Sequence, residues 1–218
     1  AQTETPIEQV EAILVTHENI DHVRSLPVVG RKTNGSRIYA NEKTCDSISK
    51  KGPEEKKQLF VTGEDFYIDT IRVRPFSIPH DAADPVGFSF YEGDKQISIV
   101  TDAGHVTEEM FQEILNADLL VLEANHEIEV LQMCSYPYRV KRRILGDNGH
   151  LSNVTAGNCI CRLIREKDKA RQILLGHLSH QNNDPQLARI TVENILREET
   201  FYIGDKLKME VILRDRLS

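Results

Sequence analysis

Four absences limit what this chain of 218 residues can be. It has no tryptophan, and its four cysteines form no CxxC pair, so a cysteine-based metal site is not expected. No apolar run approaches the roughly 20 residues that a helix needs to cross a bilayer. No charged segment followed by an apolar one opens the chain, as a secretory signal would. We therefore expect a cytoplasmic protein with reduced, structural thiols and no membrane partner.

The composition is that of an ordinary globular protein, with 39% hydrophobic and 28% charged residues. The net charge of −7 argues against a generally basic protein that coats nucleic acid. It does not exclude an enzyme in which metal ions and a local basic patch hold a phosphodiester. The oligomeric state does not follow from these numbers.

Strand-like and helix-like segments alternate along the chain. The expected strands are residues 12–16, 37–40, 65–67, 70–76, 87–91, 96–101, 119–123, 172–176 and 208–213. The expected helices are residues 21–31, a segment after Asn41, and residues 107–116, 152–166 and 185–199, while residues 50–58 form a charged surface segment. Without repeats or linkers, this pattern predicts one α/β domain over residues 1–218, with a mixed pair of sheets covered by helices.

The run Ile13-Leu-Val-Thr-His17-Glu-Asn19-Ile-Asp21-His22 is the most informative stretch. Apolar and β-branched residues, typical of a buried strand, end at a cluster of imidazole and carboxylate groups. Because a strand end is rigid, side chains on it and on the next turn can be held in metal-ligand geometry.

Three further strands are each followed by a nitrogen or oxygen ligand. His80 follows the strand that ends near Phe76, Asp102 follows residues 98–101, and His177 follows residues 173–176. A lone histidine after a strand is usually structural, but four such placements together favour a metal site. Zinc and manganese use this type of ligand.

At these residues the chain resembles the metallo-β-lactamase superfamily, and most closely its bacterial WalJ (YycJ)-type subgroup of metal-dependent, exonuclease-like hydrolases. The first matching stretch approximates the superfamily motif His-x-His-x-Asp-His. The matching stretches are Thr16–His22, Pro79–Gly87, Thr101–Gly104, Leu122–His126, Lys141–Ile144, Gly149–Asn153 and Gly176–Asn183. The His-Asp-Ala-Ala-Asp-Pro and His-Leu-Ser-x-x-Asn-Asn stretches make the subgroup match more specific than the motif alone.

The resemblance implies an αββα sandwich with two divalent metal ions, zinc or manganese, at one edge of the sheets. The first ion would be held by His17, position 19 and His80. The second would be held by Asp21, His22 and His177, with Asp102 bridging both. The implied reaction is hydrolysis of a phosphodiester in DNA or RNA by a metal-activated water, with Asp21 and His150 as catalytic residues.

The chain departs from the family pattern in two places. Asn19 stands where the second histidine of the motif is expected, and a neutral amide oxygen is a weaker ligand for zinc-like ions. Asn19 is open to three interpretations: an engineered inactivating change, a tolerated ligand swap, or drift toward a mononuclear or inactive protein. Only eleven residues precede the motif strand, so the N-terminal strands of the fold are expected to be missing from this chain.

Several residues are candidates for binding substrate. His150 precedes an expected helix, where free N–H groups favour an anion. The stretch from Tyr136 to Arg143 interleaves aromatic rings with cations, which suits nucleic acid but is also common on a solvated face. The candidates are Arg139, Lys141, Arg142 and Arg143, together with Asn182 and Asn183 in the turn after His177.

Three functions remain open from the sequence. The first is a metal-dependent phosphodiesterase or exonuclease with a nucleic acid substrate. The second is a small-molecule hydrolase of the same fold acting on an ester, thioester or lactam. The third is a binding or regulatory protein with a degraded metal site, which only Asn19 directly supports. One scaffold hosts many chemistries, so the fold alone does not choose among them.

Overall fold

The computed structural model describes residues 6–33, 35–48 and 56–213, so most of the charged segment expected at residues 50–58 lies outside it. The chain forms two compact units. The first consists of Ala1–Ser77 and Asp81–Phe88, and the second of Ile78–His80 and Ser89–Ser218. All four cysteines are free thiols. Within the described ranges, no helix is long and apolar enough to span a membrane.

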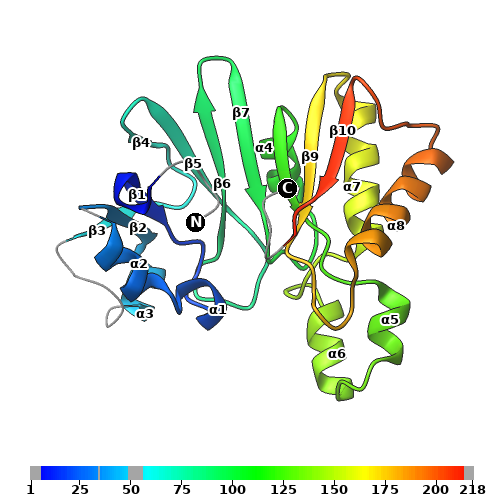
Figure 1. The fold of residues 1–218 in the computed structure, drawn as a ribbon, viewed down its shortest axis with the longest axis horizontal. Coiled ribbons are helices and arrows are strands. Elements are labelled where there is room, and N and C mark those ends of the chain that lie inside the picture. The colour runs from blue at the N-terminus through cyan, green and yellow to red at the C-terminus, as the bar shows by residue number, and fades with distance from the viewer. Residues whose placement is uncertain (1–5, 34, 49–55, 214–218) are drawn as a thin grey trace. The chain divides into compact units, whose positions relative to one another are not determined.

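A three-stranded parallel sheet organises the first unit (Figure 1). A short 3-10 helix at Ile7–Gln9 precedes it. Its strands, in spatial order, are β1 (Ala12–Leu14), β2 (Arg37–Asn41) and β3 (Lys57–Phe60). Its core includes Val15, Val23, Leu26, Ile38 and Ile48. An antiparallel pair, β4 (Phe66–Ile68) and β5 (Ile71–Ser77), completes the unit, and Phe66 stacks on Phe60 with ring centroids 5.3 Å apart.

The prediction of a single helix over residues 21–31 is wrong, because this region forms two helices. The first, α1 (Ile20–Val23), stops before α2 (Leu26–Lys32), which has Pro27 in its first turn. Proline has no N–H to donate and clashes with the preceding turn, so it begins a helix far more readily than it continues one. The expected cap at Asn41 is confirmed, since its side chain accepts a hydrogen bond from the Thr44 amide at the start of α3 (Glu42–Ser47).

Parallel strands organise the second unit. Strand β6 (Val86–Glu92) enters it from the first unit, and a short turn leads into β7 (Lys95–Val100). Then follow β8 (Leu119–Glu123), β9 (Arg171–Gly176) and β10 (Leu207–Val211), each parallel to its neighbour in the order β7-β8-β9-β10. The carboxyl ends of these four strands therefore lie at the same edge.

Three capped helices pack in the second unit. They are α4 (Glu108–Ile114), α7 (Asn153–Glu166) and α8 (Pro185–Glu198), which begin after the capping residues Thr107, Ser152 and Asp184. Their buried residues include Phe111 and Ile160. A β-carbon on Gly157 of α7 would lie only 2.8 Å from the Ile195 side chain of α8, so the two helices approach closely at this glycine.

Two helices were not expected from the sequence, α5 (Ile128–Met133) and α6 (Tyr138–Leu145). Figure 1 shows both beyond the carboxyl ends of the parallel strands. Leu131 is the only residue buried in α5, and α6 buries none. With six and eight residues, both helices are shorter than the window of about 11 residues over which an apolar repeat predicts a helix.

The turn after β7 packs against the turn after α6 without room for a side chain. A β-carbon on Gly104 would lie 2.1 Å from the carbonyl oxygen of Asp147 and 2.6 Å from the amide nitrogen of Gly149. Gly104 also donates a backbone hydrogen bond to Pro79, at 2.8 Å. These two contacts hold the segments around residues 79, 104 and 147 together.

We expect Gly104→Ala to lower the free energy of unfolding by about 3 kcal/mol, because the backbone must move to admit the methyl group. Urea denaturation measures the change. Gly204→Ala is the matched control, since a β-carbon there meets nothing within 4 Å, and its cost should stay within about 0.5 kcal/mol. Equal effects of the two substitutions would contradict the close packing.

Candidate metal centre

Three polar side chains gather at the carboxyl edge of the parallel strands. Asp102 follows β7, Glu123 is the last residue of β8, and His177 follows β9 directly. Asp102 and His177 have backbone φ angles of 60° and 56°, in the left-handed region that side chains other than glycine rarely adopt. Such strain costs about 1–3 kcal/mol per residue and is concentrated at functional sites. Two strained residues side by side therefore mark this edge as a candidate site.

Two imidazoles face Asp102 in the same way. The Nε2 atoms of His80 and His177 lie 3.7 and 3.6 Å from Asp102 Oδ1. On the other side of each ring, Nδ1 donates to an oxygen, Gly149 O for His80 (3.1 Å) and Glu123 Oε1 for His177 (2.7 Å). An oxygen at Nδ1 fixes the ring and directs Nε2 toward Asp102. A histidine that ligates a metal usually has its other ring nitrogen held by an oxygen in this way.

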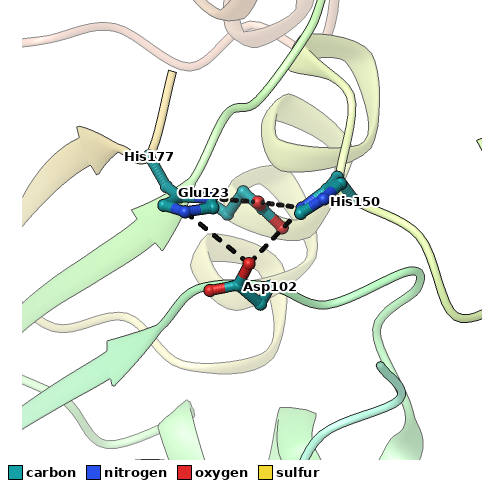
Figure 2. Close-up of side chains that lie close together, drawn as sticks. All are labelled: Asp102, Glu123, His150 and His177. Atoms are coloured by element: carbon teal, nitrogen blue, oxygen red, sulfur yellow. Dashed lines mark hydrogen bonds and ion pairs between the residues drawn. The ribbon is translucent and has the colours of Figure 1, made fainter. Parts of the chain in front are cut away.

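Glu123 is the centre of this arrangement (Figure 2). Its Oε1 accepts hydrogen bonds from the Nδ1 atoms of His150 (2.8 Å) and His177 (2.7 Å). Its Oε2 accepts from the backbone amides of Ala103 (3.0 Å) and Leu151 (3.1 Å). The residue is completely buried. One carboxylate thus fixes two imidazoles and two backbone segments.

Glu123 remains ionised at neutral pH despite its burial. Burial by itself raises the pKa of this carboxyl group, but the hydrogen bonds and charges of His150 and His177 outweigh it, so the pKa lies below its usual value. An ionised carboxylate can only accept hydrogen bonds, which matches the four donors around it.

The spacing of the donors fits a divalent ion. In a tetrahedral centre with bonds of about 2.1 Å, ligand atoms lie about 3.4 Å apart, close to the distances from Asp102 Oδ1 to the histidine nitrogens. One ligand atom from each of Asp102, Glu123, His150 and His177 lies within 4.8 Å of the others. Imidazole nitrogen and carboxylate oxygen are the donors that zinc and similar ions accept.

The predicted ligands of the first unit lie around the end of β1. The rings of His17 and His22 are tilted against each other with centroids 4.2 Å apart, and Thr16 Oγ1 lies 3.0 and 3.4 Å from their Nδ1 atoms. Asp21 Oδ2 lies 3.5 Å from His22 Nε2, and Asn19 directly precedes α1. Their roles as metal ligands stay predictions, as does a catalytic role for Asp21.

The predicted substrate-binding residues occupy two different environments. Arg139, Lys141, Arg142 and Arg143 all lie on helix α6. Asn182 is buried, and Asn183 Nδ2 donates to the Ala124 carbonyl (2.8 Å) and to Asn153 Oδ1 (2.9 Å). These bonds give Asn183 a structural role between two loops, so its contact with substrate stays a prediction.

Sequence reasoning did not assign a role to Glu123, although a signal was present. Glu123 ends the apolar strand β8 with a charged group, as Asp102 and His177 follow their own strands. A charge that comes directly after four apolar residues is costly to bury unless it is hydrogen-bonded. A polar residue at the carboxyl end of an apolar strand was the signal that predicted the metal ligands, and Glu123 has the same position.

His126 is a second buried group beside this site. Its side chain is only 1% exposed, and neither ring nitrogen has a hydrogen-bond partner among the residues that the structure describes. Burial lowers the pKa of His126 to about 4, since the negative charge of Glu123 only partly opposes the loss of hydration. The imidazole is therefore neutral at physiological pH.

We expect Glu123→Gln to weaken metal binding about 10–100-fold, the usual cost of losing an outer partner of a histidine ligand. A neutral amide cannot accept hydrogen bonds from all four donors, so the imidazoles lose their orientation. Isothermal titration with Zn²⁺ measures the affinity. Glu127→Gln is the control, because Glu127 is also buried but accepts from Asn153 (3.0 Å) and Thr191 (2.7 Å) rather than from a histidine. Unchanged affinity in Glu123→Gln would contradict its positioning role.

His126 should make the protein less stable in acid. Its folded pKa of about 4 lies below the ordinary value of 6.5, so the unfolded chain binds more protons between these values. The free energy of unfolding therefore falls as the pH falls from 6.5 toward 4, by about 3 kcal/mol from this residue. Urea denaturation of chelator-treated protein at both pH values measures this decrease. It should be about 3 kcal/mol larger in the wild type than in His126→Leu. Equal decreases in the two proteins would refute the role of His126.

Comparison with known proteins assigns the chain to a family. A beta-lactamase superfamily domain matches residues 1–178. Exodeoxyribonuclease YycJ from Bacillus anthracis is 37% identical over 211 residues, which are 95% of this chain and 79% of that protein. Exodeoxyribonuclease WalJ from Streptococcus pneumoniae is 37% identical over 207 residues, 93% of this chain and 76% of that protein.

The fold itself has a solved counterpart. The crystal structure of the metallo-beta-lactamase fold protein YhfI from Bacillus subtilis matches with a TM-score of 0.68 at 16% identity, over 96% of this chain and 78% of that one. The expected metallo-β-lactamase fold is thereby confirmed. The chain therefore belongs to the family of beta-lactamase superfamily domains.

Proposed function

We propose that this protein is a metal-dependent exonuclease that hydrolyses phosphodiester bonds of nucleic acid in the cytoplasm. The observation that supports this most directly is the group of imidazoles around Asp102 Oδ1, two of them fixed by the buried Glu123. The relatives that are 37% identical over almost the whole chain have the name exodeoxyribonuclease.

The metal-binding residues of the second unit are His80, Asp102 and His177. Both imidazoles present Nε2 toward Asp102 Oδ1 and keep Nδ1 occupied by an oxygen. These residues would hold a divalent ion, which would supply Lewis acidity to stabilise negative charge on phosphate oxygens. We propose zinc or manganese as the ion. His17, Asn19, Asp21 and His22 of the first unit stay predicted metal ligands.

His150 is suited to transfer a proton rather than to bind a metal. Its Nδ1 donates to Glu123 Oε1, which fixes the orientation of the ring. The ring is partly exposed, with 23% of the side chain accessible, so Nε2 can meet a substrate. Nε2 can hold a proton and give it to the oxygen that leaves phosphorus, and can later remove a proton from water.

Chelation and one conservative substitution test the proposed function. The wild-type protein with added Zn²⁺ or Mn²⁺ should shorten an end-labelled oligonucleotide from one end, and a chelator should abolish the cleavage. Asp102→Asn should lower the cleavage rate by at least about 100-fold. This is more than the effect expected from losing a residue that only hydrogen-bonds to a metal ligand. Asparagine tolerates the left-handed backbone found at this position, so the variant should fold.

His180→Gln is the matched control, because it removes an exposed imidazole that has no role in the proposed site. Its cleavage rate should equal that of the wild type. The nuclease proposal is refuted if the metal-loaded wild-type protein cleaves neither DNA nor RNA and the Asn19→His variant is equally inactive. Elemental analysis of both forms shows whether the amide at position 19 reduces the number of bound ions.

A further inference from the structure

Helix α6 is strongly basic in an acidic protein. Four of its eight residues, Tyr138–Leu145, are arginine or lysine, and none is acidic, whereas the whole chain has a net charge of −7. Arg139, Arg142 and Arg143 are exposed, and Lys141 is half-buried. The helix therefore forms a local positive surface that the overall charge does not suggest.

The cations of α6 also differ from those of the neighbouring helices in their partners. Arg162 pairs with Glu108 and Glu166, and Arg189 pairs with Glu193. By contrast, neither Arg139 nor Arg142 forms an ion pair with any residue in the described part of the chain. Positive charges left without carboxylate partners remain available to an external anion.

The arrangement of α6 suits a single nucleic acid strand. Arg139, Arg142 and Arg143 are three and four positions apart, so they share one face with about 5–6 Å between neighbouring β-carbons. Tyr138 is 75% exposed and lies one turn before Arg142. A row of cations next to an exposed aromatic ring is how proteins bind single strands, with phosphates on the cations and a base on the ring.

The C-terminal end of α6 is joined closely to the candidate metal centre. The His150 amide donates to the Ile144 carbonyl (3.0 Å), and the Gly149 carbonyl accepts from His80 Nδ1 (3.1 Å). A β-carbon on Gly149 would lie 2.1 Å from Ile144 O, so the turn packs directly on the last turn of the helix. In the middle of the helix, Lys141 Nζ donates to the Gln132 carbonyl in the last turn of α5 (2.6 Å). The helix is thus held in place next to His150 and His80.

We propose that α6 is the docking helix for the single-stranded nucleic acid substrate, with Arg139 and Arg142 binding its phosphates and Tyr138 stacking on a base. This inference rests on the proposed function, since it names how the substrate of that site is held. A strand that lies along α6 toward its C-terminal end arrives at His150, where the scissile phosphate is needed.

The test is binding of a fluorescein-labelled single-stranded 20-mer, followed by anisotropy as a function of salt concentration with the metal-loaded protein. Arg139→Gln with Arg142→Gln should raise Kd about tenfold or more and reduce the salt slope by about 2, one for each lost phosphate contact. Tyr138→Ala should raise Kd by about fivefold or more without changing the salt slope, because stacking is not ionic. All three side chains are exposed, so the variants should keep the melting temperature of the wild type.

Lys95→Gln with Lys208→Gln is the matched control. It removes the same charge from exposed residues near the amino ends of β7 and β10, at the opposite edge from the metal centre. Its Kd and salt slope should equal those of the wild type. Arg139→Lys with Arg142→Lys should restore most of the affinity, since the charges are retained.

Three outcomes overturn the proposal. The first is an unchanged Kd for the 20-mer in the arginine variant, and the second is an equal loss of affinity in the lysine control. The third is a loss of affinity in the arginine variant for duplex DNA or polyglutamate but not for the 20-mer, which would indicate a different partner. A wild-type protein that binds the 20-mer but does not cleave it would refute the proposed function and not the docking role of α6. Normal cleavage by the wild type together with unchanged binding in the arginine variant would refute only the role of α6.

Discussion

The arrangement of the candidate metal centre depends on the buried carboxylate of Glu123. Its four hydrogen bonds join two histidines and the backbone on both sides of β8. Burying a charge without partners would cost several kcal/mol, and the four donors offset this cost. The same hydrogen bonds make the imidazoles rigid. Stability and metal-ligand geometry therefore depend on one interaction.

Backbone strain and close packing complete that rigidity. Asp102 and His177 adopt left-handed conformations after β7 and β9, the strands on either side of β8, and Gly104 leaves no space between its turn and the turn after α6. Strained residues persist only where surrounding contacts over-determine them. The second unit thus supplies a rigid edge for chemistry. Beside it stands α6, a helix with no buried residue, whose Arg139 and Arg142 form no ion pair with the residues that the structure describes.

Elements that cover a core were predictable from the sequence, whereas elements at the surface were not. Strand β8 has the expected bounds, and the helix beginning after Ser152 was found because its cap and its apolar residues agree. The helix expected over residues 21–31 was divided at Pro27, whose effect on the backbone competes with the apolar pattern. Helices α5 and α6 bury one residue and none, so hydrophobic periodicity could not reveal them.

The sequence by itself determined the family, the positions of the strands and the polar residue types at their carboxyl ends, because hydrophobic patterns and polar residues after strands are local features. Only the tertiary structure decided which of those groups meet. It brought Glu123 between His150 and His177, residues that lie 27 and 54 positions away in the chain. Contacts over such separations follow from strand order and packing, which no local pattern encodes.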